Sequence, residues 1–178
     1  MITLSLDHPF LKLRPAHNED GEGMSRLIAR IFSDYENCPF LPHEFPELEA
    51  PADHYRGKKK GELWILEDTR TDTTFPVAGS LAITPTYHPA RFELFKVYLS
   101  HELRGSGLSQ VMLNNALDFA RARRASEIML WTDTRFHAGH RFYEKAGFVR
   151  VAGIRQLHDA AETFEFGYRL ALTAIKGS

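Results

Sequence analysis

The sequence predicts a mixed α/β fold in which helices cover both faces of one central sheet, mostly antiparallel, of about six or seven strands. Two observations predict this fold class, and a third predicts that it forms a single domain. Short apolar runs alternate along the chain with amphipathic segments of helical period. Aromatic residues make up 12% of the chain, with 13 phenylalanines, which favours a sheet-based core. The length of 178 residues fits a single domain, residues 1–178.

The first predicted elements are a strand and a helix. Phe10 to Arg14 alternates apolar and polar residues before Pro15, which predicts a strand that stops at the proline. Asp20 could cap the helix that follows, because apolar residues recur at helical spacing after it. They are Met24, Leu27, Ile28, Ile31 and Phe32.

Residues 33–60 break both periods, because they contain several prolines and many acids. The prolines are Pro39, Pro42, Pro46 and Pro51, and the acids include Glu36, Glu44, Glu47, Glu49 and Asp53. Two explanations stay open at this point. The segment could cover a site as a lid, or it could connect two helices through short turns.

Three strands are predicted next. Leu63 to Glu67 and Phe75 to Ile83 are apolar runs on either side of a polar turn, Asp68 to Thr74, and this pattern predicts a hairpin. Phe92 to Leu99 is the next strand of the same sheet.

The second half of the chain predicts two helices and three strands. The clearest helix spans residues 109–124, with an apolar face and three arginines at its C-terminal end, where cations are favoured. The other elements are a strand at 127–131, a helix at 138–146 ended by Gly147, and strands at 148–152 and 163–172.

Composition limits the kinds of partner. Lys plus Arg total 22 and Asp plus Glu total 23, so the net charge of −1 leaves no basic footprint, and we expect no nucleic-acid partner. Cys38 is the only cysteine and the histidines show no ligand spacing, so we expect neither a disulfide nor a metal. Since no apolar run reaches membrane-spanning length and no signal peptide is evident, we expect no membrane association and a cytoplasmic protein.

A turn of small residues, Arg104 to Ser109, joins the strand at 92–99 to the helix that follows. Such a turn presents free backbone N–H groups at the positive end of a helix, which suits a phosphate or pyrophosphate. Gly105 and Gly107 permit the backbone angles and the close approach that this needs. The alternative is a simple strand-to-helix turn.

Three motifs occur in order and together resemble the GNAT superfamily of acyl-CoA-dependent N-acyltransferases. They are Glu93 to Leu99, Arg104 to Ser109, and Phe142 to Phe148, the last reading Phe-Tyr-Glu-Lys-Ala-Gly-Phe. The chain departs from the family pattern at Ser109, where Gly or Ala is usual, and at Phe136, where an Asn is often found. The resemblance is close over the C-terminal half and limited to element order in the N-terminal half.

The resemblance implies a sheet splayed around an acyl-CoA cleft, with residues 92–148 as the acyl-CoA-binding core and residues 33–60 on the acceptor side. It implies acetyl-CoA as co-substrate. The pantetheine arm would bind to the strand residues Val97, Tyr98 and Leu99. The pyrophosphate would bind to the turn residues Arg104, Gly105, Ser106, Gly107, Leu108 and Ser109.

The resemblance also implies two catalytic residues. Tyr143 resembles the general acid that protonates the departing CoA thiolate, although a half-buried aromatic residue at a helix end is the alternative. Glu93 matches the acid that leads the family strand and is the best candidate base, although it could equally face solvent. His137 or His140 could serve as the base instead.

Acceptor-side residues are less well determined. Glu44 and the other acids of residues 33–60 could attract a cationic amine, or they could form a solvated charged connection. Asp133 and Arg135 lie just beyond the strand that borders the predicted cleft. Arg135 could hold a substrate carboxylate, or it could form a salt bridge with Asp133 or Asp159.

The sequence therefore predicts an N-acetyltransferase that acetylates the primary amine of a small molecule by direct attack in a ternary complex. The alternatives are acetylation of a protein lysine or N-terminus, and a non-catalytic acyl-CoA-binding module. A homodimer is also expected to be possible, because many relatives are dimers. Phe164 and Phe166 could form that contact, or, since they alternate with Glu165, they could face the protein's own core.

Overall fold

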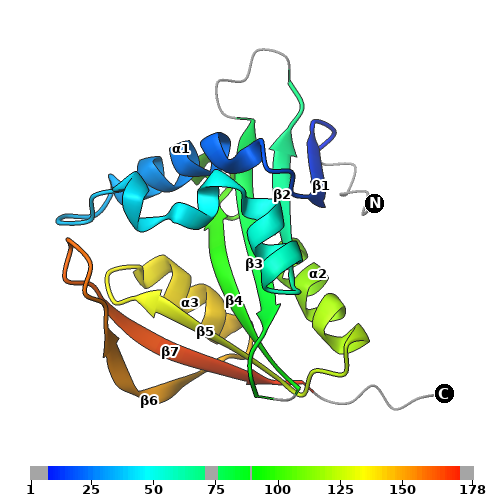
Figure 1. The fold of residues 1–178 in the computed structure, drawn as a ribbon, viewed down its shortest axis with the longest axis vertical. Helices are drawn as coiled ribbons and strands as arrows, with labels where there is room; N and C mark the ends of the chain where they lie inside the picture. The colour runs from blue at the N-terminus through cyan, green and yellow to red at the C-terminus, as the bar shows by residue number, and fades with distance from the viewer. Residues whose placement is uncertain (1–7, 71–75, 89, 173–178) are drawn as a thin grey trace.

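The structure is a computed structural model that describes residues 8–70, 76–88 and 90–172. Within these ranges the chain forms one seven-stranded sheet with the strand order β1-β2-β3-β4-β5-β7-β6. The pair β4 and β5 is parallel and the other neighbouring pairs are antiparallel. Helices cover both faces of the sheet (Figure 1). The predicted fold class is therefore confirmed.

The N-terminal strands form the antiparallel half of the sheet. They are β1 (Leu11–Pro15), β2 (Glu62–Asp68) and β3 (Val77–Pro85). The strands β2 and β3 are antiparallel neighbours, as predicted for the hairpin. Residues 71–75, which include the expected start of the second strand at Phe75, lie outside the described part of the chain.

Helix α1 (Asp20–Phe32) forms where the helical spacing predicted it, but Asp20 does not cap it. Asp20 is the first residue of the helix. Its carboxylate accepts the backbone N–H of His17 at 2.7 Å and pairs with the guanidinium of Arg14 at 2.8 Å. The expected cap was wrong because a buried ion pair to β1 uses the carboxylate, and the helix start is thereby fixed to the sheet.

The segment after α1 folds into short helical turns. These are η1 (Pro42–Glu44), η2 (Pro46–Glu49) and the π-helical turn η3 (Asp53–Lys58). The first two begin at a proline, whose fixed φ suits the first helical position. Leu48 and Tyr55 are buried and pack with α1 against the sheet. Short turns therefore explain the segment's mixed pattern.

The second half contains the remaining elements. They are β4 (Arg91–Leu99), α2 (Leu108–Ala122), β5 (Glu127–Asp133), α3 (His137–Lys145), β6 (Val149–Gln156) and β7 (Phe164–Ala171). Helix α2 ends two residues before the expected end, and Arg124 then takes a φ of 61°. Strand β5 is longer than expected because it pairs with β7 as far as Asp133 opposite Glu165.

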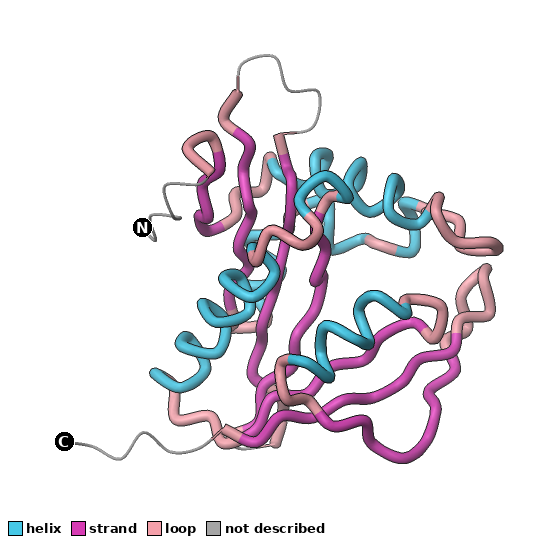
Figure 2. Tube along the Cα trace, turned by 180° about the vertical axis from the view of Figure 1, so that it is seen from behind, coloured by secondary structure: helices cyan, strands magenta, loops and turns pink. Residues whose placement is uncertain are grey.

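Two cores lie on opposite faces of the sheet. Alternation along β2 directs Trp64 and Leu66 toward the face covered by α2 and α3, and Leu63 and Ile65 toward the face covered by α1. Figure 2 shows the same layers from behind. Of the helices described, none has the length and apolar character needed to cross a bilayer.

Strand β7 contains Phe164 and Phe166, the two residues considered for the homodimer contact. Phe166 packs against the core, and the guanidinium of Arg150 lies 3.3 Å from the centre of its ring. Phe164, at the start of β7, is 46% exposed. One of the two rings therefore faces the protein's own core, and the homodimer stays a prediction.

The sheet splays between β4 and β5. These strands pair from Arg91 opposite Glu127 to Leu94 opposite Leu130, and no further. Beyond that point β5 continues along β7 while β4 continues along β3 (Figure 2). The predicted splay is therefore present, and one edge of β4 is left open from Phe95 to Leu99.

Candidate active site

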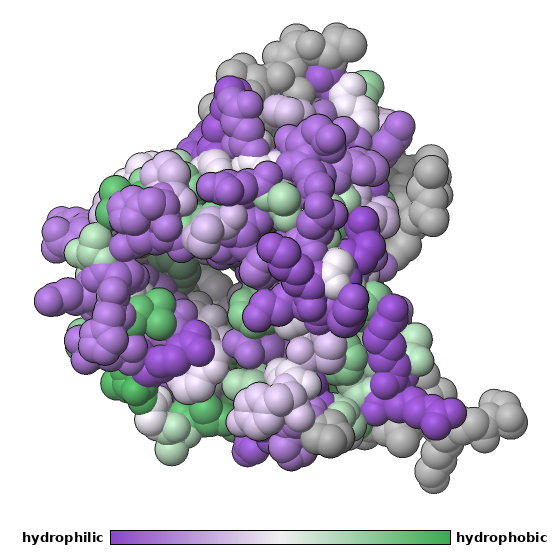
Figure 3. Space-filling model, in the orientation of Figure 1, coloured by the Kyte–Doolittle hydropathy of each residue, from purple (hydrophilic) through white to green (hydrophobic). Residues whose placement is uncertain are grey.

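A cleft of about 820 Å³ opens where β4 and β5 part. It is lined by β4, β5 and β7, by the starts of α2 and α3, and by the end of α1 with the segment after it. Figure 3 shows the hollow between the α1 half and the β5–β7 half of the molecule. Most of the predicted site residues line it: Glu44, Glu93, Val97, Tyr98, Leu99, Arg104, Gly105, Gly107, Ser109, Asp133, Arg135 and Tyr143.

Two predicted residues have side chains that lie away from the cleft. Leu108 is buried in the core beneath α2, with 3% of its surface exposed. The hydroxyl of Ser106 donates to the carbonyl of Leu103 at 2.6 Å. Their backbone N–H groups also have partners, since that of Ser106 donates to the carbonyl of Leu103 at 3.3 Å and that of Leu108 to the hydroxyl of Ser106 at 3.4 Å. Neither residue therefore offers an unpartnered donor for the expected pyrophosphate contact.

The start of α2 carries backbone donors without partners. Gly105 and Gly107 adopt φ values of 80° and 84°, in the left-handed region that favours glycine. The N–H groups of Gly105, Gly107 and Ser109 have no acceptor among the residues that the structure describes. The first turn of α2 contains no acidic residue, so the positive end of the helix dipole is not neutralised. This end of the cleft suits an anion.

The open edge of β4 offers main-chain groups to the cleft. Tyr98 lies opposite Ser80 on β3, and the N–H of Ser100 donates to the carbonyl of Ala78 at 2.8 Å. Because main-chain groups alternate in direction along a strand, those of Val97 and Leu99 point away from β3 toward the open edge. Tyr98 instead presents its ring to the cleft.

Lys96 marks an irregularity in the same strand. It has a φ of 50°, its carbonyl accepts the hydroxyl of Ser80 at 2.7 Å, and the register with β3 shifts at this point. Its ammonium pairs with Glu47 and lies 4.6 Å from the centre of the Phe45 ring. The distorted strand therefore anchors the turns η1 and η2 beside the cleft.

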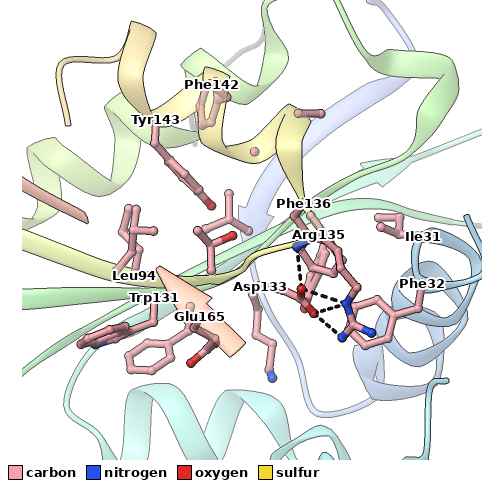
Figure 4. A pocket seen from close by; sticks show the side chains of 18 of the residues that line it. Ile31, Phe32, Leu94, Trp131, Asp133, Arg135, Phe136, Phe142, Tyr143 and Glu165 are labelled. Atoms are coloured by element: carbon pink, nitrogen blue, oxygen red, sulfur yellow. Dashed lines mark hydrogen bonds and ion pairs between the residues drawn. The ribbon is translucent and has the colours of Figure 1, made fainter. Parts of the chain in front are cut away.

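Tyr143 projects from α3 into the middle of the cleft (Figure 4). Its ring is held between Phe148 and Tyr168, with centroids 5.8 and 6.0 Å away. Burial raises the pKa of the Tyr143 hydroxyl, so the group stays protonated at neutral pH. A protonated hydroxyl in this position can donate to a developing negative charge.

Glu93 lies on β4 inside the cleft and is half-buried. Burial raises the pKa of its carboxyl, and the nearby Glu165 raises it further against the opposing effect of Arg155. In the described part of the chain, Glu93 belongs to no ion pair. A carboxylate with a raised pKa and no partner is suited to accept a proton.

Neither of the histidines considered as a base lines the cleft. His137 is exposed, and His140 is buried with its Nε2 donating to the carbonyl of Asp133 at 2.8 Å. Burial lowers the pKa of His140, which keeps the ring neutral and makes it a link between α3 and β5.

Asp133 and Arg135 form an ion pair with each other at the end of β5, with nitrogen–oxygen distances of 2.6 to 3.1 Å (Figure 4). The same guanidinium donates to Thr163 at 3.1 Å and to the carbonyl of Asn37. Of the two salt-bridge partners considered for Arg135, the structure selects Asp133. The pair also connects β5 to the segment after α1.

Glu44 makes a second connection across the mouth of the cleft. Its carboxylate accepts the N–H of Ala160, in the loop between β6 and β7, at 2.8 Å. Together with the contact from Arg135 to Asn37, this joins residues 33–45 to the opposite wall. These two connections are called the acceptor-side straps below.

Several lining residues were missed by sequence reasoning. Glu165 lines the cleft and pairs with Arg155 at 2.6 Å, while Arg155 lies 4.5 Å from the centre of the Trp131 ring. The alternation of Glu165 with Phe164 and Phe166 was a usable signal for an acid on a different face. No local signal identifies Arg155, because its position depends on pairing between β6 and β7.

Within the described ranges, no group of three or more His, Cys, Asp or Glu side chains is placed to hold a metal ion. Cys38 is free and buried, and it lines the cleft near Arg135.

Comparisons with known proteins agree with this geometry. Residues 28–148 match the family model described as the acetyltransferase (GNAT) family. Human N-acetyltransferase 8 is 26% identical over 98 residues, which is 54% of this chain and 42% of that protein, so the chain spans less than half of this relative's length.

Solved structures share the fold. An acetyltransferase from Streptococcus agalactiae has a TM-score of 0.75 at 19% identity, covering 92% of this chain and 99% of its own. A Salmonella typhimurium protein, solved with its cofactor acetyl-CoA, has a TM-score of 0.67 at 15% identity, covering 94% of this chain and 97% of its own.

Proposed function

This chain belongs to the GNAT acetyltransferase family, and we propose that it transfers an acetyl group from acetyl-CoA to a primary amine of a small molecule. One observation carries the proposal. The open edge of β4 lies in one cleft with the unpartnered N–H groups of α2 at one end and with Glu93 and Tyr143 further along it. The cleft therefore combines an anion site, an extended main-chain edge, a candidate base and a candidate acid.

The residues present fit acetyl-CoA. The N–H groups of Gly105, Gly107 and Ser109, with Arg104 beside them, would hold the pyrophosphate. The main-chain groups of Val97 and Leu99 would pair with the pantetheine amides as a neighbouring strand does. When bound, acetyl-CoA supplies an acetyl group activated as a thioester.

The transfer forms a bond between the amine nitrogen and the acetyl carbon while the carbon–sulfur bond breaks. The amine loses one proton and the departing thiolate gains one. In this proposal Glu93 accepts the first, directly or through water, and Tyr143 donates the second. Holding the amine against the thioester supplies much of the remaining rate enhancement.

The acceptor-side straps favour a small molecule over a protein lysine or N-terminus. A polypeptide acceptor needs an open passage for its chain, in both directions from a lysine and in one direction from an N-terminus. Glu44 bonded to Ala160, and Arg135 bonded to Asn37, join the two walls where such a passage would run. An amine that fits within the cleft needs no such passage.

Calorimetry with acetyl-CoA tests the binding half of the proposal. Ser109→Glu adds a negative charge at the expected pyrophosphate site, yet an acid in the first turn of α2 is favourable to the helix, so the variant should fold. We expect wild-type protein to bind, Ser109→Ala to bind about as well, and Ser109→Glu to bind about tenfold more weakly or worse. Folded wild-type protein that binds no acetyl-CoA would refute the proposal.

Tyr143→Phe tests the chemical half. We expect acetyl-CoA binding to be retained, while the turnover measured by thiol release with an accepted amine falls about a hundredfold. An unchanged turnover number would exclude Tyr143 as the acid and leave the proton to water.

A further inference from the structure

Five aromatic rings gather at the acceptor end of the cleft. They are Phe32, Tyr35, Phe45, Tyr98 and Phe136, called the aromatic wall below. They come from the end of α1, the segment after it, β4 and the start of α3, so segments far apart in the sequence build one surface.

Phe32 is the centre of the aromatic wall. The centroid of its ring lies 5.6 Å from that of Phe136, 6.0 Å from that of Phe45 and 6.1 Å from that of Tyr98. Tyr35 extends the wall beyond Phe136 at 4.8 Å. These spacings are those of tilted and edge-to-face aromatic pairs. Figure 4 shows Phe32 and Phe136 side by side next to Arg135.

The aromatic wall is not sealed within the core. Every one of its residues is only half-buried, and every one lines the cleft. Ring surface is therefore left for a ligand, and further edge-to-face or stacked contacts are available to a flat ring. Pockets for small molecules are commonly lined by aromatic side chains with a few placed polar groups.

The charges of the same end favour a cation. Lys96, Arg135 and Arg155 are each held by an acid in an ion pair. Glu93 is half-buried in the cleft and has no ion pair with the residues that the structure describes. The cleft thus combines a carboxylate that belongs to none of these ion pairs with an aromatic surface.

We propose that the acceptor is a primary amine joined by a short chain to an aromatic ring, with the ring against the aromatic wall and the amino group directed to Glu93. This inference rests on the proposed function, and it names the substrate class of that site. A polyamine has no flat ring to stack on the wall. A peptide would have to pass the acceptor-side straps.

A comparison of kcat/KM among amines tests the inference with wild-type protein and acetyl-CoA. The probes are phenethylamine, cyclohexylethylamine, n-butylamine, spermidine and a lysine-containing peptide, each followed by thiol release. We expect kcat/KM for phenethylamine to exceed that for cyclohexylethylamine several-fold and that for n-butylamine by about tenfold or more. The cyclohexyl probe separates an aromatic preference from a merely apolar one.

Two variants connect the preference to the wall. Phe136→Leu and Tyr35→Leu each remove one ring, and Tyr35 lies in the segment after α1, outside any helix or strand. We expect each to lower the ratio of kcat/KM between phenethylamine and n-butylamine about three- to tenfold. Phe10→Leu is the matched control, because Phe10 is 56% exposed and lies outside the cleft, and it should leave the ratio unchanged.

The outcomes separate the inference from the proposed function. Absent acetyl-CoA binding, or no thiol release with any amine, would overturn both. Binding with equal rates for all the amines, or a preference for spermidine or the peptide, would overturn the inference and leave the acetyltransferase. A ratio that both ring variants leave unchanged would also overturn it, because the wall would then serve packing alone.

Discussion

Replacing Arg135 by Met distinguishes a structural role from a substrate-binding role for this residue. Arg135 pairs with Asp133, donates to Thr163 and donates to the carbonyl of Asn37. If the guanidinium mainly joins these three segments, its loss destabilises the fold. If it mainly holds a substrate carboxylate, its loss leaves stability intact.

The magnitude follows from the burial of the pair. Removing one partner from a buried ion pair costs about 3–5 kcal/mol, because the other charge is left uncompensated. The side chain of Asp133 is 9% exposed and that of Arg135 is 25% exposed, so water reaches the site in part. We therefore expect a loss of about 2–3 kcal/mol in the free energy of unfolding. For a chain of this length, that lowers the Tm by roughly 4–12 °C.

Denaturant unfolding and thermal scans measure the effect, and a double-mutant cycle identifies its source. Arg135→Met combined with Asp133→Asn should cost less than the sum of the two single changes by about 1 kcal/mol or more. Arg141→Met is the control, because Arg141 is exposed on α3, and it should change stability by less than about 0.5 kcal/mol.

A specific result would refute this explanation of Arg135. If Arg135→Met kept the wild-type stability but raised the KM of an amine that carries a carboxylate, the residue would be a substrate ligand. The guanidinium of Arg135 would then leave Asp133 and bind the carboxylate of the substrate.

Two further perturbations test the base and the anchoring of the acceptor side. Burial raises the pKa of Glu93, so the kcat/KM of the wild type should fall as the pH decreases through a value above the pKa of an ordinary glutamate. Glu93→Gln should remove this fall at low pH. If the fall persists in the variant, another group is the base. The raised pKa also means that the folded state favours the protonated form, so ionised Glu93 destabilises the fold above that pKa, and Glu93→Gln should unfold at a higher temperature at neutral pH. Gly21→Ala should lower the free energy of unfolding by about 1–3 kcal/mol, because its Cβ would lie 1.9 Å from the carbonyl oxygen of Leu48. Gly57→Ala is the control: its Cβ would have nothing within 4 Å, so a thermal scan should show an unchanged or higher Tm.

The elements that the sequence specifies locally were predicted well. The alternation of Leu11 and Leu13, and the helical spacing of Met24, Leu27 and Ile28, record which face of each element meets a core. The splay between β4 and β5 was expected only from resemblance, because no local pattern states where two strands cease to pair.

The parts of the site that were not predicted depend on partners far away in the sequence. Glu44 bonds to Ala160 at a separation of 116 residues, and Arg135 reaches Asn37 at a separation of 98. Asp20 has the residue type of a helix cap, but Arg14 on β1 uses its carboxylate instead. Single-sequence patterns report which face is apolar and carry no information on such pairings.

The acceptor side links specificity to stability through one chain of contacts. Gly21 permits α1 to approach Leu48 in η2, Glu47 of the same turn pairs with Lys96, and Lys96 lies where β4 loses register with β3. Tyr98, two residues further along β4, belongs to the aromatic wall. A change that displaces η2 should therefore alter the choice of amine as well as the Tm. Gly21→Ala provides the check, because its ratio of kcat/KM between phenethylamine and n-butylamine should fall while its affinity for acetyl-CoA at α2 is retained. A lowered Tm with an unchanged ratio would show that η2 supports the fold without shaping the acceptor pocket.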